Sequence, residues 1–161
     1  MKLRIIAIAM LCLVASCQTP YQDSGFTGGV TAAPITDDTY RISARGNGYT
    51  AANTIQDYVL LKAAETTLAK GGTHFVIVTS ADATQQMVGQ TPGMMRTNVI
   101  GNTAYTTYSP GITYDIVKPG QDTIIKILTI VDGAPAPTGA FSAQQVFDNI
   151  NPRVIRPKTK K

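Results

Sequence analysis

The chain has 161 residues with a formal net charge of +4, 43% hydrophobic residues and two cysteines. This length and composition are ordinary for a globular chain and predict one domain with a tether and a tail. All ten acidic residues lie before Asn149, whereas five of the fourteen basic residues fall in the last nine positions. The basic balance therefore belongs largely to the tail, which argues against a nucleic-acid-binding body.

The first sixteen residues have the pattern of a secretory signal peptide. Lys2 and Arg4 give a basic start, and an apolar run from Ile5 to Ser16 follows. This run of about twelve residues is shorter than the roughly 20 that a transmembrane helix needs. A short apolar core that ends in small residues predicts a leader over 1–16.

The end of this run resembles the bacterial lipobox, Val14-Ala15-Ser16-Cys17. The resemblance implies a diacylglyceryl group on the Cys17 thiol, cleavage after Ser16 and acylation of the new amino terminus. Because each buried methylene contributes about 0.8 kcal/mol, two or three acyl chains give durable attachment. Cys12 would leave with the leader, so the mature chain would have neither a disulfide nor a cysteine metal site. The alternatives are an ordinary cleaved signal peptide with an incidental cysteine, or a cytoplasmic protein with an apolar start.

Residues 17–38 are rich in small and polar side chains without sustained periodicity. They predict a flexible tether that would span about 25 Å as a coil. Such a tether would let a domain over 39–151 stand off the lipid surface.

The first half of that domain predicts a strand followed by a long helix. Tyr40 to Arg45 alternates apolar and polar side chains, which indicates a half-buried strand. Gly46-Asn47-Gly48 predicts a turn, and Thr50 is placed to cap a helix over 51–70. Apolar residues at three- and four-residue steps give this helix one buried face.

The second half predicts mainly strands. Ser80 to Asn102 is polar and contains methionines, which indicates a long exposed excursion. A hairpin is expected around Ser109-Pro110-Gly111. The predicted elements are strands at 73–79, 103–108, 112–117 and 123–131, and a short helix from Ser142 to Ile150. This order predicts an α+β fold with a single four- to five-stranded, largely antiparallel sheet, one long helix on a face and a short C-terminal helix. If the first two strands are neighbours, that one pair is parallel.

Several segments together are similar to a family of small uncharacterised envelope lipoproteins of Gram-negative, mainly alphaproteobacterial, species. The resemblance implies envelope localisation and the fold order above, and it brings no reaction and no catalytic residues. The matching segments are Tyr40-Arg41-Ile42-Ser43, Gly46 to Thr50, Asp57-Tyr58, Leu60-Leu61, Ala63-Ala64-Glu65, Phe75-Val76-Ile77 and Val146 to Arg156.

Few residues suggest chemistry. Gly46-x-Gly48-x-x-Ala51 formally matches a dinucleotide-binding fingerprint, but the alternating strand before it favours a turn and a helix start. His74 is the single histidine, and a packed or edge position is favoured over a general base. Met87, Met94 and Met95 suggest soft copper ligation, although packing or exposed methionine is favoured. We therefore predict no catalytic residue, no metal site and no cofactor.

Residues 152–161 predict an extended, solvated basic arm beyond Pro152. Its cations suit an anionic surface such as lipopolysaccharide phosphates, anionic lipids or peptidoglycan carboxylates. A plain solubilising tail is the alternative. The basic residues are Arg153, Arg156, Lys158, Lys160 and Lys161.

These observations predict a non-enzymatic lipoprotein on the periplasmic face of the outer membrane, with an unknown envelope partner and no nucleic acid. Gln18 follows the cysteine, where an Asp would resemble an inner-membrane retention signal. One alternative is a small periplasmic hydrolase or ligand-binding protein whose site includes the methionine-containing segment. Another is an envelope-stress signalling lipoprotein.

Overall fold

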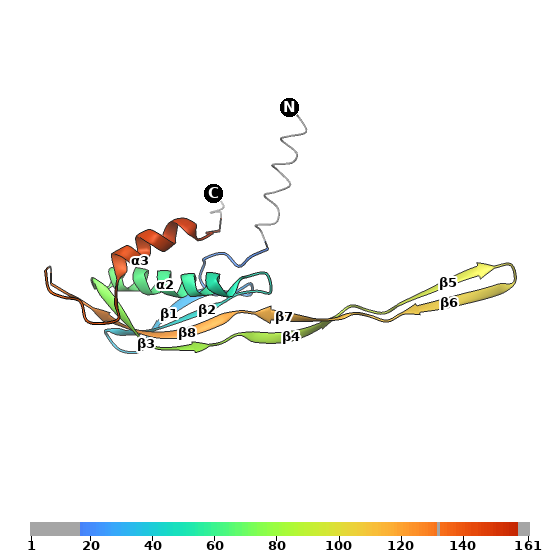
Figure 1. Ribbon diagram of the computed structural model, residues 1–161, viewed down its shortest axis with the longest axis horizontal. Helices are drawn as coiled ribbons and strands as arrows, with labels where there is room; N and C mark the ends of the chain where they lie inside the picture. The colour runs from blue at the N-terminus through green and yellow to red at the C-terminus, as the bar shows by residue number, and fades with distance from the viewer. Residues whose placement is uncertain (1–16, 132, 158–161) are drawn as a thin grey trace, which may run out of the picture. The chain divides into compact units, whose positions relative to one another are not determined.

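A computed structural model describes residues 17–131 and 133–157, which fall into two compact units (Figure 1). Of the described residues, the first unit holds 17–85 and 118–157, and the second holds 86–117. The predicted leader over 1–16 lies outside the described residues, as do Lys158, Lys160 and Lys161.

The first unit contains a five-stranded sheet in the order β1-β2-β8-β3-β9, with every neighbouring pair antiparallel. The expected α+β class and antiparallel sheet are confirmed. β8 separates β2 from β3, so the parallel pair considered from sequence does not form. The strands are β1 Gly29–Pro34, β2 Thr39–Arg45, β3 His74–Asp82, β8 Gly120–Leu128 and β9 Ala140–Ser142.

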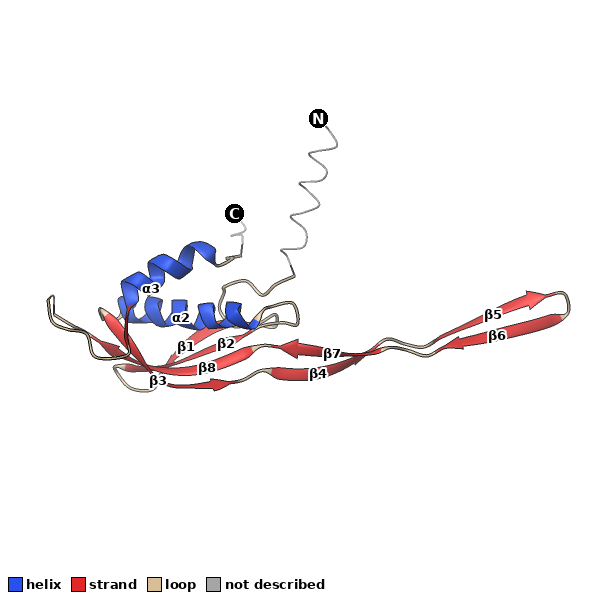
Figure 2. Ribbon diagram, in the orientation of Figure 1, coloured by secondary structure: helices blue, strands red, loops and turns tan. Residues whose placement is uncertain are grey.

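Two helices lie on one side of this sheet (Figure 2). The long helix α2 (Ala52–Ala69) packs on the sheet, and α3 (Ala143–Ile150) packs on α2. A short 3₁₀ turn, η2 (Asn151–Arg153), follows α3. No helix among residues 17–131 and 133–157 is long and apolar enough to cross a bilayer.

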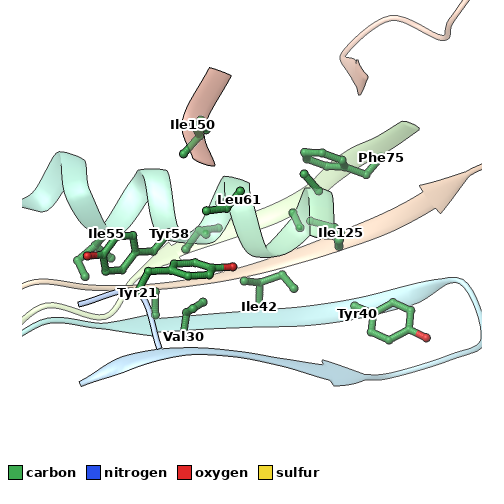
Figure 3. Packing of buried hydrophobic residues seen from close by; sticks show 14 of the residues in the cluster. Tyr21, Val30, Tyr40, Ile42, Ile55, Tyr58, Leu61, Phe75, Ile125 and Ile150 are labelled. Atoms are coloured by element: carbon green, nitrogen blue, oxygen red, sulfur yellow. The ribbon is translucent and has the colours of Figure 1, made fainter. Parts of the chain in front are cut away.

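The core lies between the sheet and the helices (Figure 3). Alternation along β2 buries Tyr40, Ile42 and Ala44 and leaves Arg41 exposed, because successive side chains of a strand point to opposite faces. Apolar positions three and four residues apart on α2 meet the same layer. The buried apolar residues of α2 are Ile55, Tyr58, Val59, Leu61, Ala63 and Ala64.

The start of α2 differs from the expectation in one respect. The helix begins after Ala51, and no side chain caps it. Thr50 was the expected cap, but its hydroxyl is engaged by Asn47 and by the amide of Thr19. The end of the helix agrees, since Gly71 adopts φ 75° directly after Lys70, as a left-handed helix stop requires.

The predicted flexible tether over 17–38 is wrong for most of its length. β1 pairs with β2 from Gly29 opposite Arg45 to Pro34 opposite Tyr40. Thr19, Tyr21 and Val30 are buried. The sequence G-V-T-A-A-P shows little alternation because an edge strand of this sheet buries few large side chains.

The second unit is a two-stranded antiparallel ribbon. β5 (Met94–Ile100) pairs with β6 (Thr103–Ser109), and β4 (Gln85–Gln90) pairs with β7 (Thr113–Lys118). The strands therefore lie in one long hairpin that turns at Gly101-Asn102.

Two expectations for this region are wrong. Residues 80–102 are largely exposed, as expected, but most of them form strands, and 103–108 does not pair with 112–117. Pro110-Gly111 separates β6 from β7 on one side of the hairpin and does not reverse the chain. The hydrogen-bond ladder is interrupted there because proline has no N–H to donate. The reversal falls at Gly101, whose φ of 62° suits a two-residue hairpin turn.

Candidate functional site

Cys17 is the first described residue, and its thiol is exposed. Its backbone carbonyl accepts a hydrogen bond from the Asn47 side-chain amide at 2.8 Å. Gln18, the next residue, donates from Nε2 to Thr54 Oγ1 at 2.9 Å. A group attached to the Cys17 sulfur would therefore project into solvent from a backbone that is bonded to the domain.

Thr19 fixes the chain two residues after Cys17, with 1% of its surface exposed. Its amide donates to Thr50 Oγ1 at 3.0 Å, and its carbonyl accepts from the Tyr58 hydroxyl at 2.7 Å. Its hydroxyl donates to the Thr27 carbonyl and accepts from the Asn47 amide, both at 2.9 Å. We call Asn47, Thr50 and Tyr58 the anchor clamp, because these three residues hold the segment that follows Cys17.

The glycine-containing turn builds this clamp. Asn47 Oδ1 accepts from the Tyr49 amide at 3.0 Å and from the Thr50 hydroxyl at 2.9 Å. A Cβ on Gly46 would lie 2.9 Å from Thr50 Cβ, closer than side chains pack. The segment that matches a dinucleotide fingerprint thus forms a turn that holds the N-terminal segment.

Tyr21 joins the N-terminal segment to both α2 and the C-terminal segment. Its hydroxyl donates to Glu65 Oε2, its ring meets the Tyr58 ring edge-on at 5.3 Å, and the Arg156 guanidinium lies 4.7 Å from its centroid. Its amide donates to the Ile155 carbonyl at 2.7 Å. Burial and the hydrogen bond to Glu65 raise the pKa of this phenol well above its usual range.

The predicted basic arm is only partly an arm. Arg153 Nη2 lies 2.6 Å from Asp57 Oδ1, and Arg156 Nη2 lies 2.8 Å from Glu65 Oε1. Arg153 and Arg156 are exposed, as expected, but they do not belong to a free arm, because their charges meet carboxylates of α2. Lys158, Lys160 and Lys161 are outside the described residues.

The remaining candidates stand apart from this site. The His74 Nδ1 atom lies 2.9 Å from Thr73 Oγ1, on a strand next to β8 and β9. Met94 and Met95 are both exposed on the ribbon. Among the residues that the structure describes, no three His, Cys, Asp or Glu side chains are grouped to hold a metal ion.

A hollow of about 240 Å³ lies beside the start of α2, lined in part by Gln56, Ser80, Asp82 and Gln121. The carboxylate there is Asp82, which accepts hydrogen bonds from the amide and hydroxyl of Thr84. These bonds lower the pKa of Asp82 below its ordinary value, so that it stays ionised at neutral pH. A carboxylate in this state is a weak base for proton transfer.

Comparison of the chain with protein-family models, with curated proteins and with solved structures finds no match.

Proposed function

We propose that this protein is a non-enzymatic lipoprotein on the periplasmic face of the outer membrane, and that it serves as a structural or interaction domain held close to the bilayer by lipid on Cys17. The observation that carries this proposal is the anchor clamp. It bonds the domain to the segment directly after an exposed lipobox cysteine.

The clamp sets how far the domain can stand from its lipid. Gln18 alone separates Cys17 from the buried Thr19. Two extended residues reach about 7 Å, whereas the flexible tether expected from sequence would reach about 25 Å. A domain held this closely suits contacts with headgroups or with proteins at the membrane surface better than a long reach into the periplasm.

The C-terminal segment supports the same placement. The Tyr21 amide is bonded to the Ile155 carbonyl, so the chain that carries the last lysines starts close to the anchor. Lys161 is six residues beyond Ile155, a reach of at most about 20 Å. Acyl chains with a basic patch form a two-signal membrane attachment. The anionic partners that suit this patch are lipid or lipopolysaccharide phosphates.

Gln18 supports outer-membrane placement, because it occupies the position where Asp resembles an inner-membrane retention signal. The amide of Gln18 also bonds Thr54, so its side chain lies on the domain.

The lipid claim is tested by labelling cells with a fatty-acid analogue and then separating their membranes. The wild type should carry the label in the outer-membrane fraction. Cys12→Ala is the matched control, because it removes the other cysteine and should still be labelled. Cys17→Ala should carry no label and should keep its leader, which is visible as a larger mass. Label on Cys17→Ala, or unlabelled wild type, would contradict the proposal.

A further inference from the structure

The two faces of the ribbon differ in chemistry. Cross-strand partners share a face, and β5–β6 pairs Met95 with Tyr108 and Val99 with Ala104. Thr91 pairs with Ile112 in the same register, since its amide donates to the Ile112 carbonyl at 2.9 Å. This face therefore continues along β4 and β7.

Two tyrosine rings show that this face continues past the break between the β5–β6 and β4–β7 pairs. The Tyr108 ring lies where a Cβ on Gly93 would stand, and the Tyr114 ring lies in the same way against Gly89. We define the apolar ribbon face by Met95, Val99, Tyr108, Ile112 and Tyr114. About half to three-quarters of the surface of each is exposed.

Residues 86–117 of the ribbon contain two charged residues, Arg96 and Asp115, and Lys118 ends β7 at the base of the ribbon, outside the second unit. Arg96 follows Met95 on β5 and Asp115 follows Tyr114 on β7, so both point away from the apolar ribbon face. Asn98 and Thr107 lie with Arg96 on the opposite face, which is mostly polar.

A two-stranded ribbon is marginally stable in water on its own. Contiguous exposed apolar surface also marks a contact site in a folded protein. Both arguments require that something covers the apolar ribbon face.

We propose that this face packs against the same face of a second copy of the chain. Two identical faces repel each other where they carry charge, and neither charged residue of the second unit, Arg96 or Asp115, lies on the face. The face holds large side chains next to small ones, such as Val99 opposite Ala104, which lets two copies interdigitate. A two-fold contact of this kind uses the same patch on both chains and closes on itself.

The size of the face suits a dimer. From Met87 to Val99 the ribbon extends about 40 Å at about 3.3 Å per residue, and two strands make it roughly 10 Å wide. Two such faces, with side chains standing out from both, reach about the 1,000 Å² of total buried area that a specific interface needs. The inference does not rest on lipid at Cys17, because the ribbon and its register are independent of that residue.

Met94 and Met95 provide a matched test. They are adjacent methionines with 73% and 75% of their surface exposed, and they lie on opposite faces. The molar mass of the purified full chain should be that of two copies for the wild type and for Met94→Glu. Met95→Glu should be a single copy, because an unpaired carboxylate at a dry contact raises the dimer Kd by roughly 100-fold or more.

Circular dichroism of both variants checks that the fold is kept. The wild type should be measured at roughly 10 μM, a concentration at which a specific dimer with a micromolar Kd is substantially formed. A wild-type mass of one chain at this concentration would overturn the inference. So would two variants that dissociate equally. A third outcome would overturn the inference in favour of a lipid surface. In it, the wild type is a single chain that binds phospholipid vesicles, Met94→Glu also binds them, and Met95→Glu does not.

Discussion

The hydroxyl of Tyr21 donates to Glu65 Oε2 at 2.5 Å, and the other oxygen of the same carboxylate accepts from Arg156 at 2.8 Å. One side chain of α2 thus binds the N-terminal and the C-terminal segments. A hydrogen bond to a charged group contributes about 1.5–3 kcal/mol, more than a neutral pair. The stability of this end of the domain should therefore depend strongly on Tyr21.

Tyr21→Phe should lower the free energy of unfolding by about 1–3 kcal/mol at pH 7, because the ring contacts stay and the charged hydrogen bond is lost. Urea unfolding measures this loss. Tyr49→Phe is the control. Tyr49 has 77% of its surface exposed, and the change should stay within about 0.5 kcal/mol. An equal loss in both variants would contradict a role for the Glu65 contact.

The same variant has a pH signature. The folded-state pKa of Tyr21 is raised, so above about pH 10 the unfolded chain loses its phenol proton first and the folded state is disfavoured. The stabilising effect is complete below pH 10 and declines as the pH rises further. The difference between wild type and Tyr21→Phe should shrink from pH 9 to pH 11. A difference that grows over this range would show the opposite sign.

Asn47→Ala tests the anchor clamp. It removes the contact with the Cys17 carbonyl and the two bonds that hold Tyr49 and Thr50 in the turn. Hydrogen exchange at the Thr19 amide should become at least roughly tenfold faster, while the Ile42 amide in β2 keeps its protection. Asn149→Ala, at an exposed position of α3, should leave both amides unchanged. Unchanged exchange at Thr19 in Asn47→Ala would contradict the clamp.

The elements with a local signature could be predicted from the sequence. The alternation of Tyr40, Ile42 and Ala44 is visible in six residues, and the periodicity of α2 is visible over four turns. Each pattern reports which side of its own element is buried, so it needs no knowledge of a partner.

The site could not be predicted in this way because its contacts are distant in sequence. Thr19 meets Tyr58 across 39 residues, and Arg153 meets Asp57 across 96. The sequence contains one signal for the two ion pairs. Asp57 and Glu65 are eight residues apart on one helix, so they share a face, and that face needed cations.

The sequence of the ribbon also contains a signal for its hairpin. Gly93 and Pro110 lie eight residues before Gly101 and eight residues after Asn102. Two interruptions at equal spacing about a Gly-Asn pair indicate one long hairpin, because partners across a turn are equidistant from it. A proline and glycine pair by itself suggests a turn, whereas here Pro92-Gly93 and Pro110-Gly111 face each other within one hairpin.

Leu61→Ala tests the core between α2 and the sheet. Leu61 is completely buried, and removing its side chain should cost about 2–5 kcal/mol through lost transfer energy and a cavity. Val78→Ala is the control on β3. Val78 has 61% of its surface exposed, and the loss should be about 0.5 kcal/mol or less. Chemical denaturation measures both, and similar losses would mean that Leu61 does not pack in the core.

We expect the last three lysines, and not Arg153 and Arg156, to contribute to binding at an anionic membrane. Arg153 and Arg156 are already paired with Asp57 and Glu65, so replacing both with Gln should change vesicle affinity little. These partly exposed pairs should each contribute about 0–1 kcal/mol to stability. Replacing Lys158, Lys160 and Lys161 with Gln should weaken binding to anionic vesicles by up to about 100-fold at low salt, at about 1 kcal/mol per lysine.

Co-sedimentation of a leaderless Cys17→Ala chain measures this binding without a lipid anchor. Zwitterionic vesicles are the control, and added salt should reduce the effect because it screens exposed charges beyond about 8–10 Å. If the arginine variant loses as much affinity as the lysine variant, then the ion pairs with α2 open at the membrane. In that case the closure of the C-terminal segment on Tyr21 would compete with lipid binding, and Tyr21→Phe should bind anionic vesicles more tightly.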